Sequence, residues 1–336
     1  MRSTGTKSSL IKYLLEETKI VPLHEIPRDK SKTAVIVDAM HDIRRWSFNK
    51  GEPFPNIADR YLKQLMKEKP ENTTAIHFCC DRYKDSSLKT TERTSRRGNQ
   101  QGKGTAFEVG EKFKIPEPNE FFDVSTNKAR LQVYLCERWS ALRKDTLKLI
   151  GNLKFYIGGG FEVETRAVLI NEGKVTEVPQ LQSTQEEADT RIILHSIYSA
   201  SYDDVDRIVV HSNDTDVVVL TIYFFQTMMC TVKEFWIRLS HDKCRPVHLI
   251  ADALGPDRCK LLPMAHSLGG RDTTSYLYGV GKKQWLEKAK EMDVSLLEEF
   301  GETPEESKIT PQLTEQATRL LATRNSTRTS SQISPH

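Results

Sequence analysis

The sequence predicts an α/β protein with a mainly parallel central sheet and helices on both faces. Short apolar runs of strand length are bounded by polar residues, at 33–38, 74–81, 207–211, 217–223, 234–238 and 247–251. Helical periodicity separates several of these runs, as in the segment 188–200. Because the runs are apolar almost throughout, we expect strands that are covered on both faces, which is typical of a parallel sheet.

The remaining segments suggest how the chain is organised. Residues 1–30 are weakly amphipathic, contain two prolines, and are expected to be a lead-in segment. Residues 84–112 are polar and basic without an aliphatic run, which predicts an insertion. A helical stretch follows at about 126–150, and a Gly158–Gly160 turn lies between two strand-like runs. We expect one domain over 31–300 and a disordered tail at 301–336, where Thr, Ser, Gln and Arg dominate.

Composition limits the functional classes. The formal net charge is only +3, so overall charge does not indicate nucleic acid. The six cysteines form no CxxC pair, the first residues lack an apolar signal core, and no run approaches the roughly 18 apolar residues of a membrane span. We expect no membrane association and an intracellular location, nuclear rather than cytoplasmic; protein partners are not predicted.

Acidic residues gather where the predicted strands end. Two aspartates end apolar runs, two follow the run 207–211, three acids open the helix after residue 185, and one lies in the Gly-rich segment 269–275: Asp38, Asp81, Asp214, Asp216, Glu186, Glu187, Asp189 and Asp272. In an open α/β sheet the ligand crevice lies outside the carboxyl ends of the strands. Up to eight carboxylates are therefore expected at one edge.

Such a cluster needs counter-charge, because carboxylates a few ångström apart cannot all ionise. Hard oxygen ligands favour Mg²⁺ or Mn²⁺ over zinc. Two such ions can activate a water and stabilise the leaving oxygen of a phosphodiester. The expected chemistry is thus phosphodiester hydrolysis without a nucleophilic side chain.

Each acid also has a structural interpretation. Asp38 and Asp81 fit turn residues after strands, and Asp214 and Asp216 fit Asx turns. Thr184 with Glu187, or Ser183 with Glu186, fits a capping box, and Asp272 fits a helix cap. The joint occurrence of these acids at strand ends favours the metal site.

The ordered motifs resemble those of the flap endonucleases and their PIN-like relatives. Val35–Met40 is similar to the first strand with its metal-binding aspartate, and Phe78–Asp81 to the second. Glu187-Ala-Asp189, Asp214-Thr-Asp216 and Gly270-Arg-Asp272 resemble the later acidic motifs. The resemblance covers about residues 31–290. It implies a PIN-like domain, a two-metal nuclease for DNA or RNA, and catalytic metal ligands at Asp38, Asp81, Glu187, Asp189, Asp214 and Asp216, with Asp272 as a further metal ligand.

Basic residues complete the resemblance. Lys89, Arg96 and Arg97 are similar to the side chains of the helical arch over the scissile phosphate, so the insertion at about 84–150 is expected to be arch-like. Lys282 and Lys283 follow a Gly-x-Gly that resembles the start of the family's helix-turn-helix contact with duplex. The alternative for the first three is a solvated basic loop.

The sequences Glu-Glu-Ala-Asp-Thr-Arg191, Asp-Thr-Asp-Val217 and Asp-Thr-Thr-Ser275 are most similar to a largely uncharacterised, multi-copy group of animal proteins, for which an origin in mobile elements is one interpretation. Arg271 places a cation beside an expected metal ligand, and Asp189 is shorter than the usual Glu. The alternative function is therefore a catalytically inactive nucleic-acid-binding or scaffold protein that retains the fold.

Other chemistries fit less well. The chain contains no Gly-x-x-x-x-Gly-Lys-[Ser/Thr], which argues against a P-loop NTPase. Asp214-Thr-Asp216 is similar to the phosphatase Asp-x-Asp, but Val218 stands where that family has Thr. The histidines are scattered without the spacing of metal ligands.

Overall fold

The computed structural model describes residues 8–82, 104–185, 187–229, 231–239, 243–268, 283, 286 and 287. The chain divides into two compact units. The larger unit is Ile20–Ile250, and the smaller unit combines Met1–Lys19 with Ala251–His336. This division does not coincide with the boundaries expected at residues 30 and 300.

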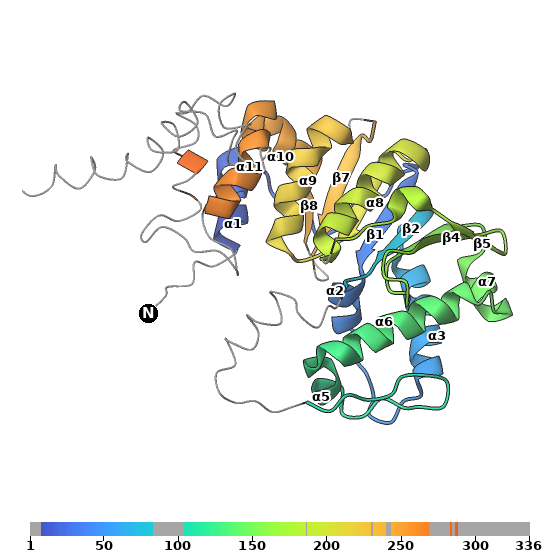
Figure 1. The fold of residues 1–336 in the computed structure, drawn as a ribbon. Coiled ribbons are helices and arrows are strands. Elements are labelled where there is room, and N and C mark those ends of the chain that lie inside the picture. The colour runs from blue at the N-terminus through green and yellow to red at the C-terminus, as the bar shows by residue number, and fades with distance from the viewer. Residues whose placement is uncertain are drawn as a thin grey trace, which may run out of the picture. The chain divides into compact units, whose positions relative to one another are not determined.

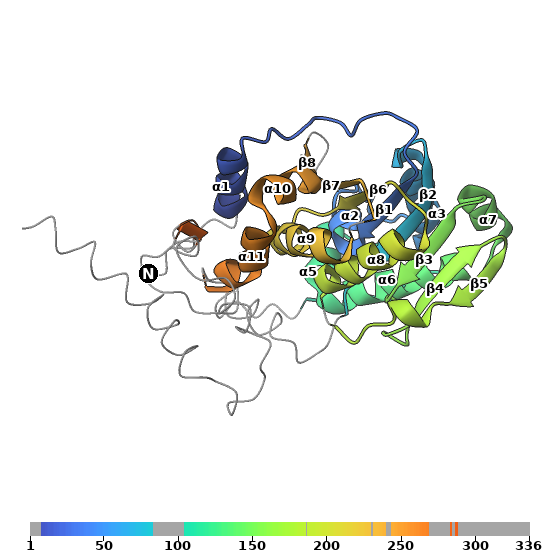
Figure 2. The same ribbon diagram turned by 90° about the horizontal axis from the view of Figure 1, so that it is seen from above.

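An eight-stranded mixed sheet forms the centre of the larger unit. Its order is β5-β4-β3-β2-β1-β6-β7-β8. The strands are β1 Thr33–Asp38, β2 Thr73–Cys79, β3 Lys154–Gly158, β4 Ala167–Asn171, β5 Lys174–Glu177, β6 Arg207–His211, β7 Glu234–Arg238 and β8 Cys244–Pro246. The five strands from β3 to β7 in the sheet order are parallel, whereas β4, β5 and β8 are antiparallel to their neighbours. Figure 2 shows β4 and β5 extending one edge of the sheet. The mainly parallel α/β class is confirmed.

Helices cover both faces of this sheet (Figure 1). They are α2 Ala39–Arg44, α3 Phe54–Glu68, α5 Pro118–Asp123, α6 Ser125–Ser140, α7 Lys144–Ile150, the 3-10 turn η1 Pro179–Leu181, α8 Ala188–Tyr202 and α9 Thr215–Met228, and α10 Val247–Leu254 begins where the larger unit ends. Helix α8 packs against β1, β2 and β6 and beside α9. Helices α3 and α6 lie on the opposite side of the sheet.

The principal core lies between the sheet and the layer of α3 and α6. Val37 and Phe78 of the sheet are buried with Tyr61 of α3 and with Leu135 and Trp139 of α6. The expected arch-like insertion at about 84–150 falls partly outside the described residues. Its described part includes α5, α6 and α7, and the buried face of α6 belongs to this core.

Two predicted strands are helices. The run 217–223 lies in α9, and the run 247–251 lies in α10. Helix α9 buries Val217, Val218 and Val219 in succession, so its sequence is apolar around most of its circumference. An apolar run of this length does not distinguish a buried strand from a buried helix, and the β-branched valines favoured the wrong choice.

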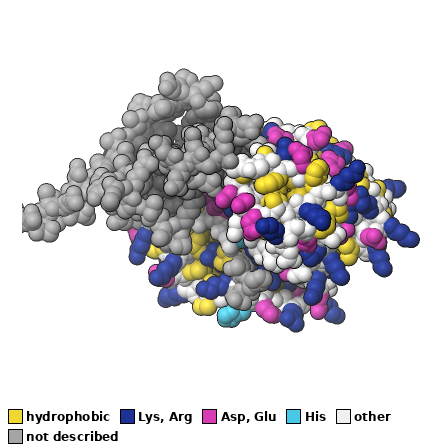
Figure 3. All heavy atoms as spheres, turned by 90° about the horizontal axis from the view of Figure 1, so that it is seen from below, with side chains coloured by type: hydrophobic (Ala, Val, Ile, Leu, Met, Phe, Trp, Pro, Cys, Tyr) yellow, Lys and Arg dark blue, Asp and Glu magenta, His cyan; other side chains and the backbone are white. Residues whose placement is uncertain are grey.

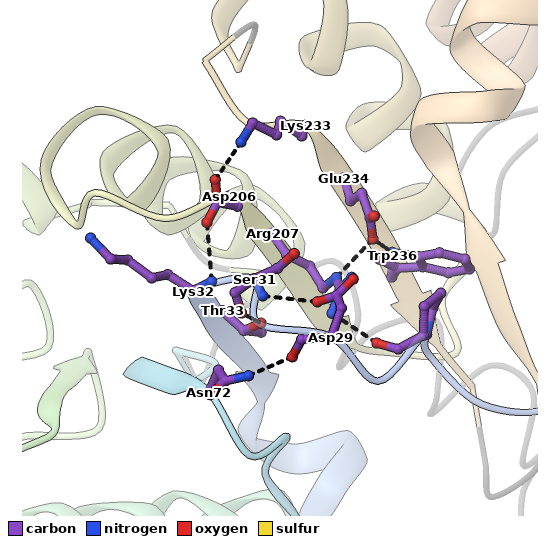
Figure 4. Close-up of polar contacts among 11 residues, drawn as sticks. Asp29, Ser31, Lys32, Thr33, Asn72, Asp206, Arg207, Lys233, Glu234 and Trp236 are labelled. Carbon is purple, nitrogen blue, oxygen red and sulfur yellow. Dashed lines mark hydrogen bonds and ion pairs between the residues drawn. The ribbon is translucent and has the colours of Figure 1, made fainter.

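The edge of the sheet at the amino end of β6 is held by one arginine (Figure 4). The nearly buried Arg207 side chain donates to Glu234 Oε2 at 2.7 Å and to Asp29 Oδ2 at 2.6 Å. It also donates to the Pro27 carbonyl oxygen at 3.0 Å. These bonds attach part of the expected lead-in segment to the sheet.

The smaller unit contains α1 Ser8–Thr18 and α11 Pro256–Leu268. Leu10 and Leu14 of α1 are buried, and Arg258 of α11 forms an ion pair with Glu17 at 2.6 Å. Residues 8–18 are therefore a packed helix, and the description of 1–30 as a lead-in alone is wrong for this part. No helix among the described residues is long and apolar enough to cross a membrane.

Candidate metal centre

The sheet order has a switch point beside β1. From β1 the chain continues to β2 and β3 on one side, and then crosses to β6 and β7 on the other side. Ligands of open α/β sheets bind at such a switch point, outside the carboxyl ends of the strands. Asp38 is the last residue of β1, Asp81 follows β2, and Asp214 follows β6. The fold thus brings three of the predicted acids to the switch point.

Three aspartates meet closely at this edge. Asp189, Asp214 and Asp216 each offer a carboxylate oxygen, and these oxygens lie within 4.8 Å of one another. Asp189 belongs to the first turn of α8, Asp216 belongs to the first turn of α9, and Asp214 caps α9. Because α8 and α9 pack side by side, the starts of the two helices supply all three side chains.

The turn at the start of α9 sets the paired aspartates. Asp214 Oδ1 accepts a hydrogen bond from the Asp216 backbone N–H at 2.9 Å, and the Asp214 N–H donates to Ser212 Oγ at 3.2 Å. Thr215 and Asp216 are helical, so Asp214 is the N-cap of α9 and Asp216 lies in its first turn. The Asx-type cap and the acidic cluster therefore coexist in the same residues.

Asp38 joins this cluster electrostatically. Its Oδ1 accepts from the His41 backbone N–H at 2.9 Å, which makes it the N-cap of α2. Burial, together with the negative charges of Asp81 and Asp214, raises the pKa of Asp38 to about 7. The backbone hydrogen bond from His41 opposes these effects. At neutral pH, Asp38 is therefore present in both its neutral and its charged form.

Asp81 links β2 to the start of α8. Its Oδ1 accepts from the Ala188 backbone N–H at 3.0 Å, at the helix end where the helix dipole favours negative charge. Glu187 is the N-cap residue of α8 but makes no side-chain cap hydrogen bond. Because α8 begins at Ala188, Thr184 is not its N-cap, and the capping box of Thr184 with Glu187 is wrong.

Arg82 is a residue of this edge that the sequence did not single out. Its guanidinium donates to Glu164 Oε2 at 2.8 and 2.6 Å and to the Thr184 carbonyl oxygen. It therefore connects the loop after β3 with the segment that leads into α8. The available signal in the sequence was the position of Arg82, a cation directly after the acid Asp81 that follows β2.

Several predicted site residues lie outside the described residues: Asp272, Glu186, Lys89, Arg96, Arg97 and Lys282. Arg271 lies there too. Lys283 is described; it is exposed, and its Nζ lies 5.2 Å from the ring centroid of Tyr13 in the smaller unit. On the face in Figure 3, basic and acidic side chains are interspersed among the coloured residues. The predicted nucleic-acid contacts stay predictions.

The donor set fits a hard divalent cation. Asp189, Asp214 and Asp216 are half-buried, and all offer carboxylate oxygens. Ligand oxygens about 2.0–2.6 Å from one Mg²⁺, Mn²⁺ or Ca²⁺ ion lie within about 5 Å of one another, which matches this separation. Without a cation the three charges repel one another.

No family model, curated protein or solved structure matches the chain. The proposed function therefore depends on the site itself and on the ordered motifs.

Proposed function

We propose that this protein is a metal-dependent nuclease with a PIN-like domain, which hydrolyses phosphodiester bonds of DNA or RNA with Mg²⁺ or Mn²⁺. The observation that carries the proposal is the meeting of Asp189, Asp214 and Asp216 at the switch point, with Asp38 and Asp81 beside them. These acids come from three strand ends and two helix starts, so they are brought together only by the tertiary fold.

Each acid has a distinct task in this proposal. Asp189, Asp214 and Asp216 hold one cation, and Asp38 and Asp81 provide further carboxylates for a second. Bound Mg²⁺ or Mn²⁺ supplies Lewis-acid stabilisation of phosphate and lowers the pKa of water. Because the pKa of Asp38 is about 7, its carboxyl group is partly protonated at neutral pH, and a bound cation would favour its charged form. Glu187 stands at the start of α8 beside this cluster and is assigned an auxiliary ligand role.

The proposal extends to residues outside the described ranges and to the described Lys283. Asp272 is a further metal ligand, and Lys89, Arg96 and Arg97 contact the substrate backbone, as do Lys282 and Lys283. The partner is thus a nucleic acid, and a nuclear location is consistent with that partner.

The second candidate is an inactive nucleic-acid-binding or scaffold protein. Arg271 favours it, because a cation next to Asp272 competes with a metal ion for the same carboxylate. Under this candidate the protein binds nucleic acid with the salt dependence of phosphate contacts but does not cleave it.

The test uses the Asp216→Asn variant. Asn keeps the shape of the side chain and removes one negative charge, so the metal-free protein should melt at an unchanged or higher temperature. Cleavage of labelled single-stranded, flap and hairpin substrates with Mn²⁺ should fall by orders of magnitude. The matched control is Asp204→Asn, because Asp204 is an exposed aspartate that pairs with Lys32. Cleavage by the Asp216 variant at the parent's rate contradicts the proposal, and binding without any cleavage by the parent favours the second candidate.

A further inference from the structure

A second polar cluster adjoins the carboxylates, on the side of the sheet covered by α2. It is the cationic cluster of His41, Arg44, Arg45, His211 and Arg238. His211 ends β6 and Arg238 ends β7, and the two are register partners. Val37 of β1 is the register partner of His211 on its other side. Register partners in a sheet project to the same face, so His211 and Arg238 share the face on which Val37 is packed.

Helix α2 brings the other members to this face. It starts directly after Asp38 and carries His41 and Arg44, and Arg45 follows as its C-cap. The positive charges of Arg238 and Arg45, together with His41, act on the ring of His211. The negative charge of Asp214 also acts on the ring of His41. The cationic cluster therefore adjoins the acidic cluster.

Several nitrogen atoms of the cationic cluster are buried without a hydrogen-bond partner. They are His41 Nε2, Arg45 Nε, and both ring nitrogens of His211. Burial lowers the pKa of His211 to about 3, and a neutral imidazole ring has one donor and one acceptor. An unpartnered buried polar group costs about 1–3 kcal/mol, and three such side chains in one place call for a common acceptor.

The neighbouring charges favour an anion. Asp42 accepts from Arg45 at 2.9 Å and from Tyr61, and Glu68 lies 3.9 Å from Arg45. Among the described residues no acid forms an ion pair with Arg44 or Arg238. Within the cluster three arginines thus stand against Asp42 and Glu68, and the nearby carboxylates of Asp38 and Asp214 belong to the adjoining metal centre. Arg44 is exposed and Arg238 is half-buried, so these two members of the cluster reach solvent.

We propose that the cationic cluster is a phosphate-binding subsite, which holds a phosphate group of a nucleotide beside the metal centre. Arg238 and Arg44 provide positive charge at its solvent side, and His41, Arg45 and His211 donate hydrogen bonds to phosphate oxygens. The proposal rests on the proposed function for its substrate class. It predicts that a phosphate next to the bond to be cleaved is held by side chains as well as by metal.

The test measures phosphate binding without divalent cations, which separates it from the metal centre. Inorganic phosphate and dAMP are titrated into the full-length protein at low ionic strength and followed by ³¹P NMR line broadening. Arg238→Gln should weaken binding at least tenfold. His211→Leu should weaken it too and should leave the melting temperature unchanged or higher, because it removes nitrogens that have no partner. Binding of dAMP but not of inorganic phosphate identifies a nucleotide site.

Arg28→Gln is the matched control. Arg28 is an exposed arginine paired with Glu25, and it lies in the segment before β1, whereas the cluster lies at the carboxyl ends of the strands. The phosphate affinity of this variant should equal that of the parent. Stabilisation by Mn²⁺ should be unchanged in Arg238→Gln, so failure of the subsite and failure of the metal centre are distinguishable. The proposal is wrong if neither probe binds, or if Arg28→Gln weakens phosphate binding as much as Arg238→Gln does. In that case ordered water molecules are the hydrogen-bond partners of these buried nitrogens.

Discussion

At the scale of single residues, the aspartates of the metal centre have two tasks at once. Asp38 and Asp214 each cap a helix through Oδ1. A carboxylate has a second oxygen, so a cap does not prevent metal binding. The structural and the functional interpretation of these residues are therefore not alternatives. Substitutions with Asn separate them, because Asn caps helices well but carries no charge.

Asp38 should make the stability of the metal-free protein depend on pH. Its pKa is raised in the folded state from 3.8 to about 7, so the folded state binds more protons than the unfolded state between these values. The contribution of Asp38 to stability should therefore fall as pH rises through this window. Thermal melts of the parent and of Asp38→Asn between pH 5 and 8, with a chelator present, measure it.

The variant should show a smaller loss of stability than the parent toward pH 8, and Mn²⁺ should restore the parent at pH 8. His41 and His211 have lowered pKa values and act in the opposite direction below pH 6.5, so the difference between parent and variant is the quantity to compare. Equal slopes in both proteins would show that Asp38 titrates normally.

At the scale of elements, the starts of α8 and α9 form the site and their other ends hold it in place. The Asp203 side chain at the end of α8 is fully buried. It accepts hydrogen bonds from Tyr156 at 2.8 Å and from Lys154 at 3.1 Å, and His77 Nε2 lies 3.0 Å away. The ring of His77 also contacts that of His195 on α8, at 3.0 Å between Nδ1 atoms. This polar network joins α8 to β2 and β3.

Removing the shared acceptor should loosen that connection. Asp203→Ala leaves the buried donors Tyr156 and His77 unpartnered and should cost about 1–3 kcal/mol of the free energy of unfolding per donor. Urea denaturation measures the loss. Asp204→Asn, at the exposed neighbour, is the control and should change stability little, because Asn tolerates the positive φ of residue 204. A small effect at Asp203 would mean that water replaces the carboxylate.

The cap of α9 predicts a difference between two variants of one residue. Asp214→Ala removes the side-chain hydrogen bond to the Asp216 N–H and should destabilise the metal-free protein by about 1 kcal/mol relative to Asp214→Asn, which keeps it. Both variants should lose stabilisation by Mn²⁺. Chemical denaturation with and without Mn²⁺ measures both effects. Retained Mn²⁺ stabilisation in Asp214→Ala would reduce Asp214 to a cap alone.

At the scale of the whole molecule, the switch point of the sheet determines where the acids meet. The strand order places β1 between β2 and β6, and α8 and α9 start at the same edge. Mutual repulsion of the acids in the metal-free state is relieved when a cation binds. Binding to the folded state alone stabilises it by mass action, by about 2.7 kcal/mol at a hundredfold excess over Kd.

Millimolar Mn²⁺ should therefore raise the melting temperature of the full chain. If the two units melt separately, the transition of the larger unit should move, because Asp189, Asp214 and Asp216 belong to that unit. Differential scanning calorimetry with and without Mn²⁺ tests this expectation. Millimolar K⁺ at matched ionic strength is the control. An unchanged melting curve with Mn²⁺ would show that the aspartates do not bind metal.

The sequence by itself determined the α/β class, four strands and the places of the acids. The runs at 33–38, 207–211 and 234–238 coincide with β1, β6 and β7, and 74–81 overlaps β2, because polar residues end each run sharply. The sequence did not separate buried strands from the helices α9 and α10, because a short apolar run has the same appearance in a buried strand and in a buried helix.

Only the tertiary structure decided which acids meet and what else surrounds them. Crossing from β3 to β6 places α8 beside α9, and this packing brings Asp189 to Asp214 and Asp216 across a long stretch of sequence. The tertiary structure also places His211 and Arg238 near Arg45 and His41 of the α2 segment. No local sequence pattern indicated a site there. The physical reason is that strand order and helix packing are set by burial of distant apolar surfaces, whereas sequence patterns report only local periodicity.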